Sequence, residues 1–329
     1  MPSASPPAAA LCQVCFGGPA AGWVRDGATP ALRVALEPLG GDDREPLLEI
    51  AAAGTLKDDL ALFRGPELCA GFVLARRELD LEAATEELYG RLFAATGGLH
   101  LHRIWNYVPQ INREDGGLEN YRRFCRARSV AFEARFGGNF HLSLPASSAV
   151  GASAGPLAVA FIGGDAPGRH LENPLQVPAF HYPPEHGPRP PSFSRATVAQ
   201  TTAGTHVFIS GTAAIRGHAT VAPGDLDGQL ECTLANLAAI GERAGAGASL
   251  GADPSWQRRF KVYLRHPDDL RAVRARLERE LLRPADQVAY LHADICRAEL
   301  VLEIEATLVP IRRNAARAGA ARIRSAGRE

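Results

Sequence analysis

The chain has very little lysine and no net charge. Of its 36 basic residues only Lys57 and Lys261 are lysines, and 36 acidic residues balance the basic ones to a formal charge of zero at pH 7. A broad electrostatic attraction to nucleic acid or to a membrane surface is therefore not expected. The other basic residues are arginines, whose planar forks suit carboxylates, so the composition is compatible with an anionic small substrate.

Long hydrophobic runs are also lacking. No apolar stretch reaches the length of a transmembrane helix, and the N-terminus has no basic segment followed by an apolar core, so no signal peptide is expected. The six cysteines are dispersed, and Cys12 and Cys15 form a lone CxxC pair, which is a weak zinc or redox signal without a second half. These absences predict a cytoplasmic protein that does not associate with membranes.

The length of 329 residues favours two domains. Residues 1–10 (MPSASPPAAA) predict a disordered start, and residues 312–329, with six arginines and one acid, predict a basic tail. A proline-rich stretch within residues 166–195 is unsuited to helix or central strand and predicts a linker. The predicted domains are therefore residues 11–165 and 196–311.

The two predicted domains share one order of elements: strand, helix, strand, helix, strand, strand. In the second half the expected segments are residues 205–215, 226–240, 259–265, 267–281, 288–295 and 300–309. In the first half they are residues 67–76, 79–95, 99–111, 118–136, 141–150 and 157–163. The fold class predicted from this repeat is α+β, with two domains that each consist of a mixed sheet with helices on one face.

The last strand of the second half carries two carboxylates. Residues alternate between two faces along a strand, so Glu303 and Glu305 share one face with Cα atoms about 6.6 Å apart, while Leu302 and Ile304 point the other way. Like charges at this distance raise at least one carboxyl pKa, which suits a general acid at neutral pH. Two solvated carboxylates on an edge strand are the structural alternative. The corresponding strand of the first half, residues 157–162 (LAVAFI), has no carboxylate, so any chemistry belongs to the second domain.

Several strings of the sequence resemble a known family. The element order and Glu303-Ile304-Glu305-Ala306 are similar to the RidA/YjgF-like (chorismate-mutase-like) fold, and further strings resemble the chorismatases, two-domain enzymes built on it. These strings are residues 103–112 (RIWNYVPQIN), 119–125 (ENYRRFC), 145–151 (PASSAVG), 173–183 (NPLQVPAFHYP), 191–196 (PSFSRA), 210–218 (SGTAAIRGH) and 294–297 (DICR). The resemblance covers about residues 100–309, and residues 1–99 match only loosely.

The resemblance implies an enzyme that removes the enolpyruvyl side chain of chorismate as pyruvate, in secondary metabolite biosynthesis. It implies no metal and no organic cofactor. Glu303 matches the general acid that protonates the enol ether, and Glu305 is expected to tune or support it. The product is expected to be mainly 3-hydroxybenzoate. The alternatives are hydrolysis to 3,4-dihydroxycyclohexa-1,5-diene carboxylate and formation of 4-hydroxybenzoate.

Two positions bear on the product through the same resemblance. Cys296 is similar to the 3-hydroxybenzoate-forming branch, although a core cysteine would also fit the composition. Ala213 is more similar to the hydrolytic branch, so the two markers disagree. Gly211 is expected to let the backbone approach the substrate closely.

Chorismate carries two carboxylates, so at least two arginines should converge on it. Arg128 matches an arginine that grips a substrate carboxylate, with the departure that Ala127 replaces a family glycine before it. Arg265 and Arg297 are the further candidates, and Tyr182 is similar to a pocket tyrosine that hydrogen-bonds the substrate. No metal-ligand spacing joins His102, His141 and His218, and we expect structural roles for these three histidines.

Two other function classes remain open at this stage. A RidA-type imine deaminase would use the same fold, but its small substrate would not need a second fused domain. A non-enzymatic binding protein could contact nucleic acid through the basic tail, although the neutral net charge and the carboxylate pair argue against it. Both a monomer and a trimer are compatible with the sequence.

Overall fold

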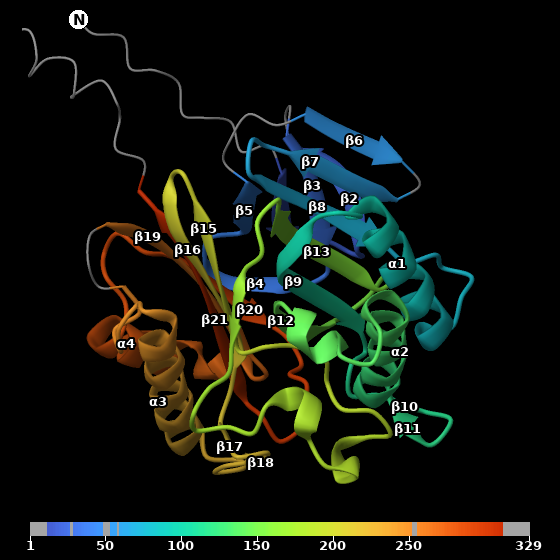
Figure 1. Ribbon diagram of the computed structural model, residues 1–329. Helices are drawn as coiled ribbons and strands as arrows, with labels where there is room; N and C mark the ends of the chain where they lie inside the picture. The colour runs from blue at the N-terminus through green and yellow to red at the C-terminus, as the bar shows by residue number, and fades with distance from the viewer. Residues whose placement is uncertain (1–11, 27–28, 49–52, 58, 252–254, 312–329) are drawn as a thin grey trace, which may run out of the picture.

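The computed structural model of the chain describes residues 12–26, 29–48, 53–57, 59–251 and 255–311 (Figure 1). The predicted disordered start (1–10) and basic tail (312–329) lie outside the described residues. Within the described part, no helix is both long enough and apolar enough to cross a bilayer.

A six-stranded sheet forms the centre of the first half, in the order β12-β9-β13-β8-β7-β6. Its strands are β6 (Ala53–Lys57), β7 (Leu60–Arg64), β8 (Leu68–Leu74), β9 (His100–Pro109), β12 (Ala146–Ala152) and β13 (Ala158–Gly164). Helices α1 (Leu81–Ala95) and α2 (Asn120–Phe136) cover its outer face (Figure 1).

A seven-stranded sheet forms the centre of the second half, in the order β14-β15-β16-β21-β19-β20-β4. Its strands are β4 (Glu37–Gly41), β14 (Arg169–Leu171), β15 (Ala196–Thr201), β16 (Gly204–Thr212), β19 (Trp256–Leu264), β20 (Gln287–His292) and β21 (Leu302–Pro310). Helices α3 (Leu226–Ala244) and α4 (Leu270–Glu280) pack on its outer face (Figure 1).

The two sheets have the same topology, which confirms the predicted repeat of element order. In the first, β13 lies between β8 and β9 and is antiparallel to both, and β12 is parallel to β9. In the second, β21 lies between β16 and β19 and is antiparallel to both, and β20 is parallel to β19. The strand that carries the two carboxylates is therefore central, and the edge-strand alternative is wrong.

The inner faces of the two sheets pack against each other. One buried apolar cluster joins side chains of the first sheet, such as Trp105 and Tyr107, to side chains of the second, such as Phe208 and Tyr263. The outer faces form two separate clusters with their helices. Glu303 and Glu305 lie on the inner face of β21, and Leu302, Ile304 and Ala306 lie in the outer cluster, as the strand period predicts.

The N-terminal strands were not predicted from the sequence, and they connect the halves. Strands β1 (Cys12–Phe16), β2 (Gly22–Asp26), β3 (Thr29–Val34) and β5 (Arg44–Leu48) form a sheet of their own in the order β2-β3-β1-β5. Between them, β4 leaves this sheet and pairs antiparallel with β20 of the second half. The domain boundaries predicted after residues 165 and 195 stay a prediction.

Local hydrogen bonding explains where the helix ends differ from those expected. Helix α1 begins at Leu81 because the Asp80 side chain accepts the backbone N–H groups of Glu82 and Ala83. Helix α2 begins at Asn120 because residues 118 and 119 pair in a short hairpin, β10 (Glu114–Asp115) with β11 (Leu118–Glu119). Pro267 opens a 3-10 turn, Pro267–Asp269, rather than α4 itself.

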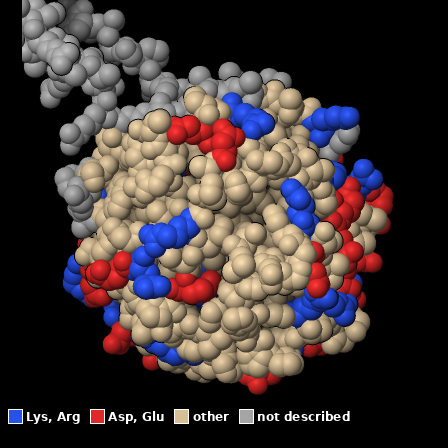
Figure 2. All heavy atoms as spheres, viewed as in Figure 1, with Lys and Arg blue, Asp and Glu red and all other residues tan. Residues whose placement is uncertain are grey.

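The remaining elements are short, and two of them lie in the predicted linker. They are the hairpin β17 (Ile215–Arg216) with β18 (Ala219–Thr220) and the 3-10 turns Phe140–Ser143, Ala179–His181 and Pro184–His186. The first of these turns precedes β12, so the extended segment expected from residue 141 begins only at Ala146. On the face seen in Figure 2, side chains of both signs are interspersed among uncharged ones, in keeping with the zero net charge.

Candidate active site

A cavity of about 430 Å³ opens between the two halves, within the range typical of small-molecule sites. Its walls come from α2, the start of β12, the linker, the end of β16 and the loop before β21. Seven of the nine residues singled out from the sequence line it: Arg128, Tyr182, Gly211, Ala213, Cys296, Arg297 and Glu303. Glu305 and Arg265 are not among the lining residues.

Glu303 is a buried carboxyl group with an unpaired oxygen. Its side chain lines the cavity, the residue is only 4% exposed, and its Oε1 atom has no hydrogen-bond partner among the described residues. Burial, assisted by the negative charge of Glu305, raises the pKa of Glu303 to about 8. The carboxyl group is therefore mostly protonated at neutral pH, which is the form that can donate a proton.

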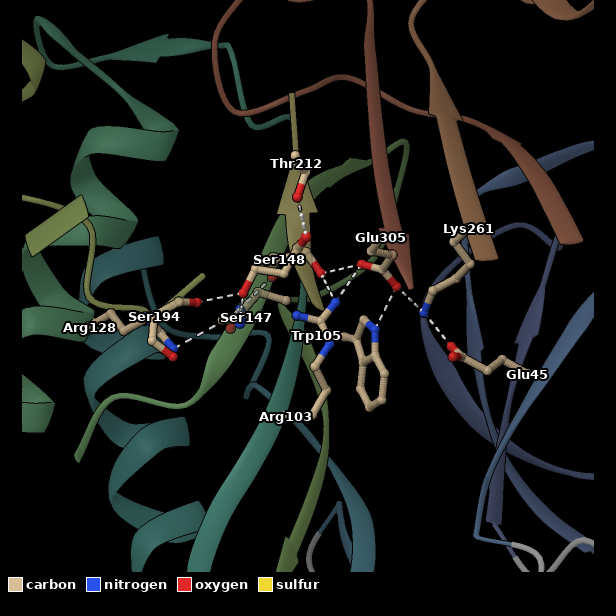
Figure 3. Close-up of polar contacts among 12 residues, drawn as sticks. Glu45, Arg103, Trp105, Arg128, Ser147, Ser148, Ser194, Thr212, Lys261 and Glu305 are labelled. Atoms are coloured by element: carbon tan, nitrogen blue, oxygen red, sulfur yellow. Dashed lines mark hydrogen bonds and ion pairs between the residues drawn. The ribbon is translucent and has the colours of Figure 1, made fainter. Parts of the chain in front are cut away.

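Glu305 lies in the opposite electrostatic situation. Its carboxylate accepts hydrogen bonds from Arg103 Nη2 at 2.7 Å, Trp105 Nε1 at 2.7 Å and the Ser148 hydroxyl, and Lys261 Nζ lies 2.6 Å away (Figure 3). Burial alone would raise the pKa of Glu305, but the charges of Lys261 and Arg103 outweigh burial and hold the pKa below its ordinary value. Glu305 is therefore an ionised structural anchor between the sheets.

A charge balance explains why the two carboxyl groups differ. Lys261 also contacts the buried carboxylate of Glu45 on β5, so that two cations, Arg103 and Lys261, meet two carboxylates, Glu45 and Glu305 (Figure 3). An ionised Glu303 would add a third negative charge to a buried group that is already neutral. Keeping the proton on Glu303 avoids that cost.

Gly211 and Ala213 form the cavity wall on β16 and just after it. A Cβ atom on Gly211 would lie 2.0 Å from Glu303 Oε1 and 2.5 Å from its carboxyl carbon, so only glycine leaves the carboxyl group in its place. Ala213 is buried, and its backbone carbonyl accepts a hydrogen bond from Asn236 Nδ2 at 3.0 Å. Both small residues thus leave room beside Glu303.

Cys296 also lines the cavity, from the loop before β21. Burial raises the pKa of its thiol to about 12, and the negative charge of Glu303 adds to this. A thiol with this pKa carries almost no thiolate at neutral pH, so Cys296 contacts the cavity as a small polarizable side chain and not as an activated nucleophile.

Arg128 is held on α2 with its guanidinium buried. Its Nε donates to Tyr89 Oη at 2.6 Å, Nη1 donates to the Ser192 carbonyl, and Nη2 reaches Ser147 Oγ only at 3.4 Å. The residue is only 3% exposed, so Arg128 is not a solvated arginine on the outer face of the helix. The fixed guanidinium lines the cavity and can receive an anion there.

Arg195 lines the cavity but is not among the site residues predicted from the sequence, although it lies in the family-like string of residues 191–196. Its Nη2 donates to Tyr182 Oη at 2.7 Å, and its buried Nε has no hydrogen-bond partner within the described ranges. Glu172 Oε2 is the nearest carboxylate oxygen to that nitrogen, 4.0 Å away. Tyr182 itself is buried, and the guanidinium of Arg297 lies 5.4 Å from its ring.

Arg265, a predicted substrate-contacting residue, does not line the cavity. Its guanidinium donates to the Leu300 carbonyl at 2.8 Å, to Asp294 Oδ1 at 2.5 Å and to the Arg297 carbonyl at 3.0 Å. These bonds fix the loop that carries Cys296 and Arg297, and they leave Arg265 outside the cavity wall. Arg297 does line the cavity, with one hydrogen bond to Thr220 Oγ1 at 3.1 Å.

The comparisons with known proteins agree with this geometry. The family described as "Chorismatase FkbO/Hyg5-like, N-terminal" matches residues 51–163. A 3-hydroxybenzoate synthase of Streptomyces hygroscopicus is 38% identical over 239 residues, which cover 69% of either chain. A chorismatase of Streptomyces rapamycinicus is 38% identical over 258 residues, 75% of this chain and 76% of the relative.

One solved structure shows similarity to a chorismatase over almost the whole chain. The crystal structure of a chorismatase at 1.08 Å resolution covers 91% of this chain and 92% of its own, with 31% identity and a TM-score of 0.77. A YjgF structure from E. coli overlaps 44% of the chain at 19% identity and a TM-score of 0.29. Both relatives are 38% identical to this chain over more than two thirds of either sequence. The chain belongs to the chorismatase family.

Proposed function

We propose that this protein releases pyruvate from chorismate and that Glu303 is the general acid. The observation that carries the proposal is a buried carboxyl group, unpaired at Oε1, with a pKa raised to about 8 by burial, which faces a cavity lined by arginines. The relatives named chorismatase and 3-hydroxybenzoate synthase support the same substrate.

The chemistry follows from the enol ether. The Glu303 proton is transferred to the methylene carbon of the enolpyruvyl group, which becomes the methyl group of pyruvate, and an oxocarbenium ion forms at the ether carbon. In the hydrolytic route water captures this ion, and the hemiketal that forms breaks down to pyruvate and the ring alcohol. In the other route the ring C4 hydroxyl captures the ion and loses its proton. Loss of the C3 proton with cleavage of the ring C4–O bond then gives the aromatic ring, and the oxygen from C4 leaves as the carbonyl oxygen of pyruvate while the C3 oxygen is protonated. Either route ends with loss of one proton, which can restore the Glu303 carboxyl group.

Two arginines are assigned to the two carboxylates of the substrate. Arg195 lies near enough to Glu303 for its charge to oppose the rise in the pKa of Glu303, so we place the enolpyruvyl carboxylate against Arg195. Arg128, held by Tyr89 and Ser192, then receives the ring carboxylate. In this assignment the first half binds the ring and the linker binds the group that is released.

The product is assigned to 3-hydroxybenzoate. Cys296 and Glu303 interact electrostatically across the cavity, so the thiol lies beside the reacting group and limits the space for an ordered water. Ala213, which also lines the cavity, favours the hydrolytic product, 3,4-dihydroxycyclohexa-1,5-diene carboxylate. We give Cys296 more weight because it lies in the loop that leads directly into β21.

Glu303→Gln should abolish turnover while substrate still binds. The amide keeps the shape but cannot donate a useful proton, and general acid catalysis contributes about 10²–10⁴-fold. In the wild-type enzyme kcat/KM should fall as pH rises through about 8, because the Glu303 proton is lost there. A lactate-dehydrogenase-coupled pyruvate assay measures both. Retention of more than about a tenth of kcat would remove Glu303 from this role.

Gly211→Ala should inactivate the enzyme without unfolding it. The new methyl group would overlap Glu303 Oε1, so the carboxyl group would have to leave the position it has beside Gly211. A displacement of about 1 Å can reduce kcat about 10²-fold. Gly90→Ala on α1 is the control, because its Cβ would meet no atom within 4 Å. Pyruvate release and thermal melting are measured for both, and an unchanged kcat in Gly211→Ala would contradict the assigned position of the acid.

Arg128→Ala and Arg195→Ala should each raise KM strongly. Loss of one partner of a buried charge pair costs about 2–5 kcal/mol, which corresponds to a rise in KM of at least about 30-fold. The matched control is Arg126→Ala on the outer side of the same helix, where Arg126 pairs with Glu82. Steady-state kinetics with chorismate decide the matter, and a KM like that of the control in either variant would withdraw that arginine from the site.

Cys296→Ala should shift the product ratio towards the hydrolysis product, because it opens space for water beside Glu303. Cys69→Ala, which removes a buried thiol outside the cavity, is the control. Products formed in ¹⁸O-labelled water are identified by mass spectrometry and NMR, and the aromatic hydroxyl of 3-hydroxybenzoate should be unlabelled. An unchanged ratio would show that Cys296 only packs, and a wild-type product other than 3-hydroxybenzoate would refute the product assignment.

A further inference from the structure

Three potential metal ligands meet where the cavity reaches solvent, and the proposed reaction uses none of them. Glu185 and His186 come from the last 3-10 turn of the linker, and His218 comes from the hairpin between β17 and β18. Glu185 and His186 also line the cavity. Within the described residues this is the one group in which three side chains of metal-binding type offer ligand atoms within 4.8 Å of one another.

Two of the three distances within the group are those that one small ion requires, and the distance between the histidine nitrogens is slightly shorter. His186 Nε2 lies 3.0 Å from His218 Nδ1, and Glu185 Oε1 lies 3.5 Å from His186 Nε2 and 3.4 Å from His218 Nδ1. Zinc binds histidine nitrogen and carboxylate oxygen at about 2.0–2.2 Å in tetrahedral geometry, which separates neighbouring ligand atoms by about 3.3–3.6 Å. Small shifts of exposed side chains would complete the triangle.

The backbone positions the three ligands from two separate segments. Gly217, with φ of +57°, supplies the left-handed turn of the two-residue hairpin loop that presents His218. The ring centroids of His186 and His218 are 5.2 Å apart, and the Tyr182 ring lies 5.2 Å from that of His186. The site therefore connects the linker to the second half at the rim of the cavity.

The charges around the three ligands limit how tightly the site binds a cation. The nearby charges of Arg297 and Arg122 oppose a cation, and the carboxylate of Glu185 offsets one of them. This charge environment favours a reversible site over a permanent structural one.

We propose that Glu185, His186 and His218 form a binding site for zinc at the mouth of the cavity and that zinc bound there restricts substrate entry. Three protein ligands leave the fourth position of the ion for water, as in open zinc sites. The ion would fasten the cavity-lining residues Glu185 and His186 to the β17–β18 hairpin and hold Tyr182 behind them. The ion is an inhibitor in this role and takes no part in the reaction. The binding site does not depend on the proposed function, whereas the restriction of substrate entry rests on it.

The experiment uses the full chain after treatment with EDTA and desalting. Cobalt(II) serves as a spectroscopic probe, and zinc is titrated in competition with a chromogenic chelator. We expect one equivalent of cobalt to give the intense visible bands of a four-coordinate site without a strong sulfur-to-cobalt band, and zinc to displace it. His218→Ala should weaken zinc binding by more than about 100-fold, since loss of even an outer partner of a ligand costs about 10–100-fold.

His292→Ala is the matched control, because His292 pairs with Glu37 on the surface at 3.2 Å without a third ligand. This variant should bind zinc as the wild type does. A cobalt spectrum with strong sulfur bands, no binding, or equal binding by His218→Ala would overturn the site. In the pyruvate assay zinc should raise KM for chorismate in the wild type and not in His218→Ala. An unchanged KM with zinc bound would overturn the restriction of entry and leave the binding site standing.

Discussion

The buried ion cluster around Glu305 is the interaction on which the rest of the site depends. It joins β21 of the second half to β9 and β12 of the first through Arg103, Trp105 and Ser148, and to the N-terminal strand β5 through Lys261 and Glu45. Buried ion pairs add little net stability, but their removal from one side leaves an uncompensated charge. The cluster therefore fixes how the two sheets face each other, and the charge of Glu305 adds to burial in keeping the proton on Glu303, two residues along the same strand.

The duplicated topology relates the two carboxylates of the second half to two small residues of the first half. On the inner face of β13, Ala158 and Ala160 pair with Tyr107 and Trp105 of β9. On the inner face of β21, Glu303 and Glu305 pair with Tyr263 and Lys261 of β19 in the same relative positions. Two small residues in one half thus correspond to two carboxylates in the other. The first half supplies one cation, Arg103, and the indole and hydroxyl donors of Trp105 and Ser148 to the Glu305 carboxylate, and the second half supplies the other cation, Lys261.

Much of this arrangement follows from local sequence patterns, and the rest depends on contacts between distant segments. The period-2 alternation from Leu300 to Leu308 placed both carboxylates on one face, and the leucine spacing of α3 and α4 marked the helices correctly. The contact of Lys261 with Glu45 joins residues 216 positions apart and leaves no local signature. The N-terminal strands were missed because most have only five residues, several with proline or glycine, and β4 acquires its role only through pairing with β20.

The site residues follow the same division. Arg265 was selected because arginines suit carboxylates, but its bonds to the loop carbonyls could not be inferred from spacing. Arg195 was not predicted as a site residue. Its Nε atom is buried and has no hydrogen-bond partner in the described part of the chain, a feature that sequence patterns do not reveal. The position of Arg195 in the cavity has a chemical consequence, because its positive charge lowers the pKa of Glu303. A substrate carboxylate bound to Arg195 would neutralise that charge and raise the pKa of Glu303 further. In the proposed assignment, substrate binding itself therefore secures the proton that the reaction uses.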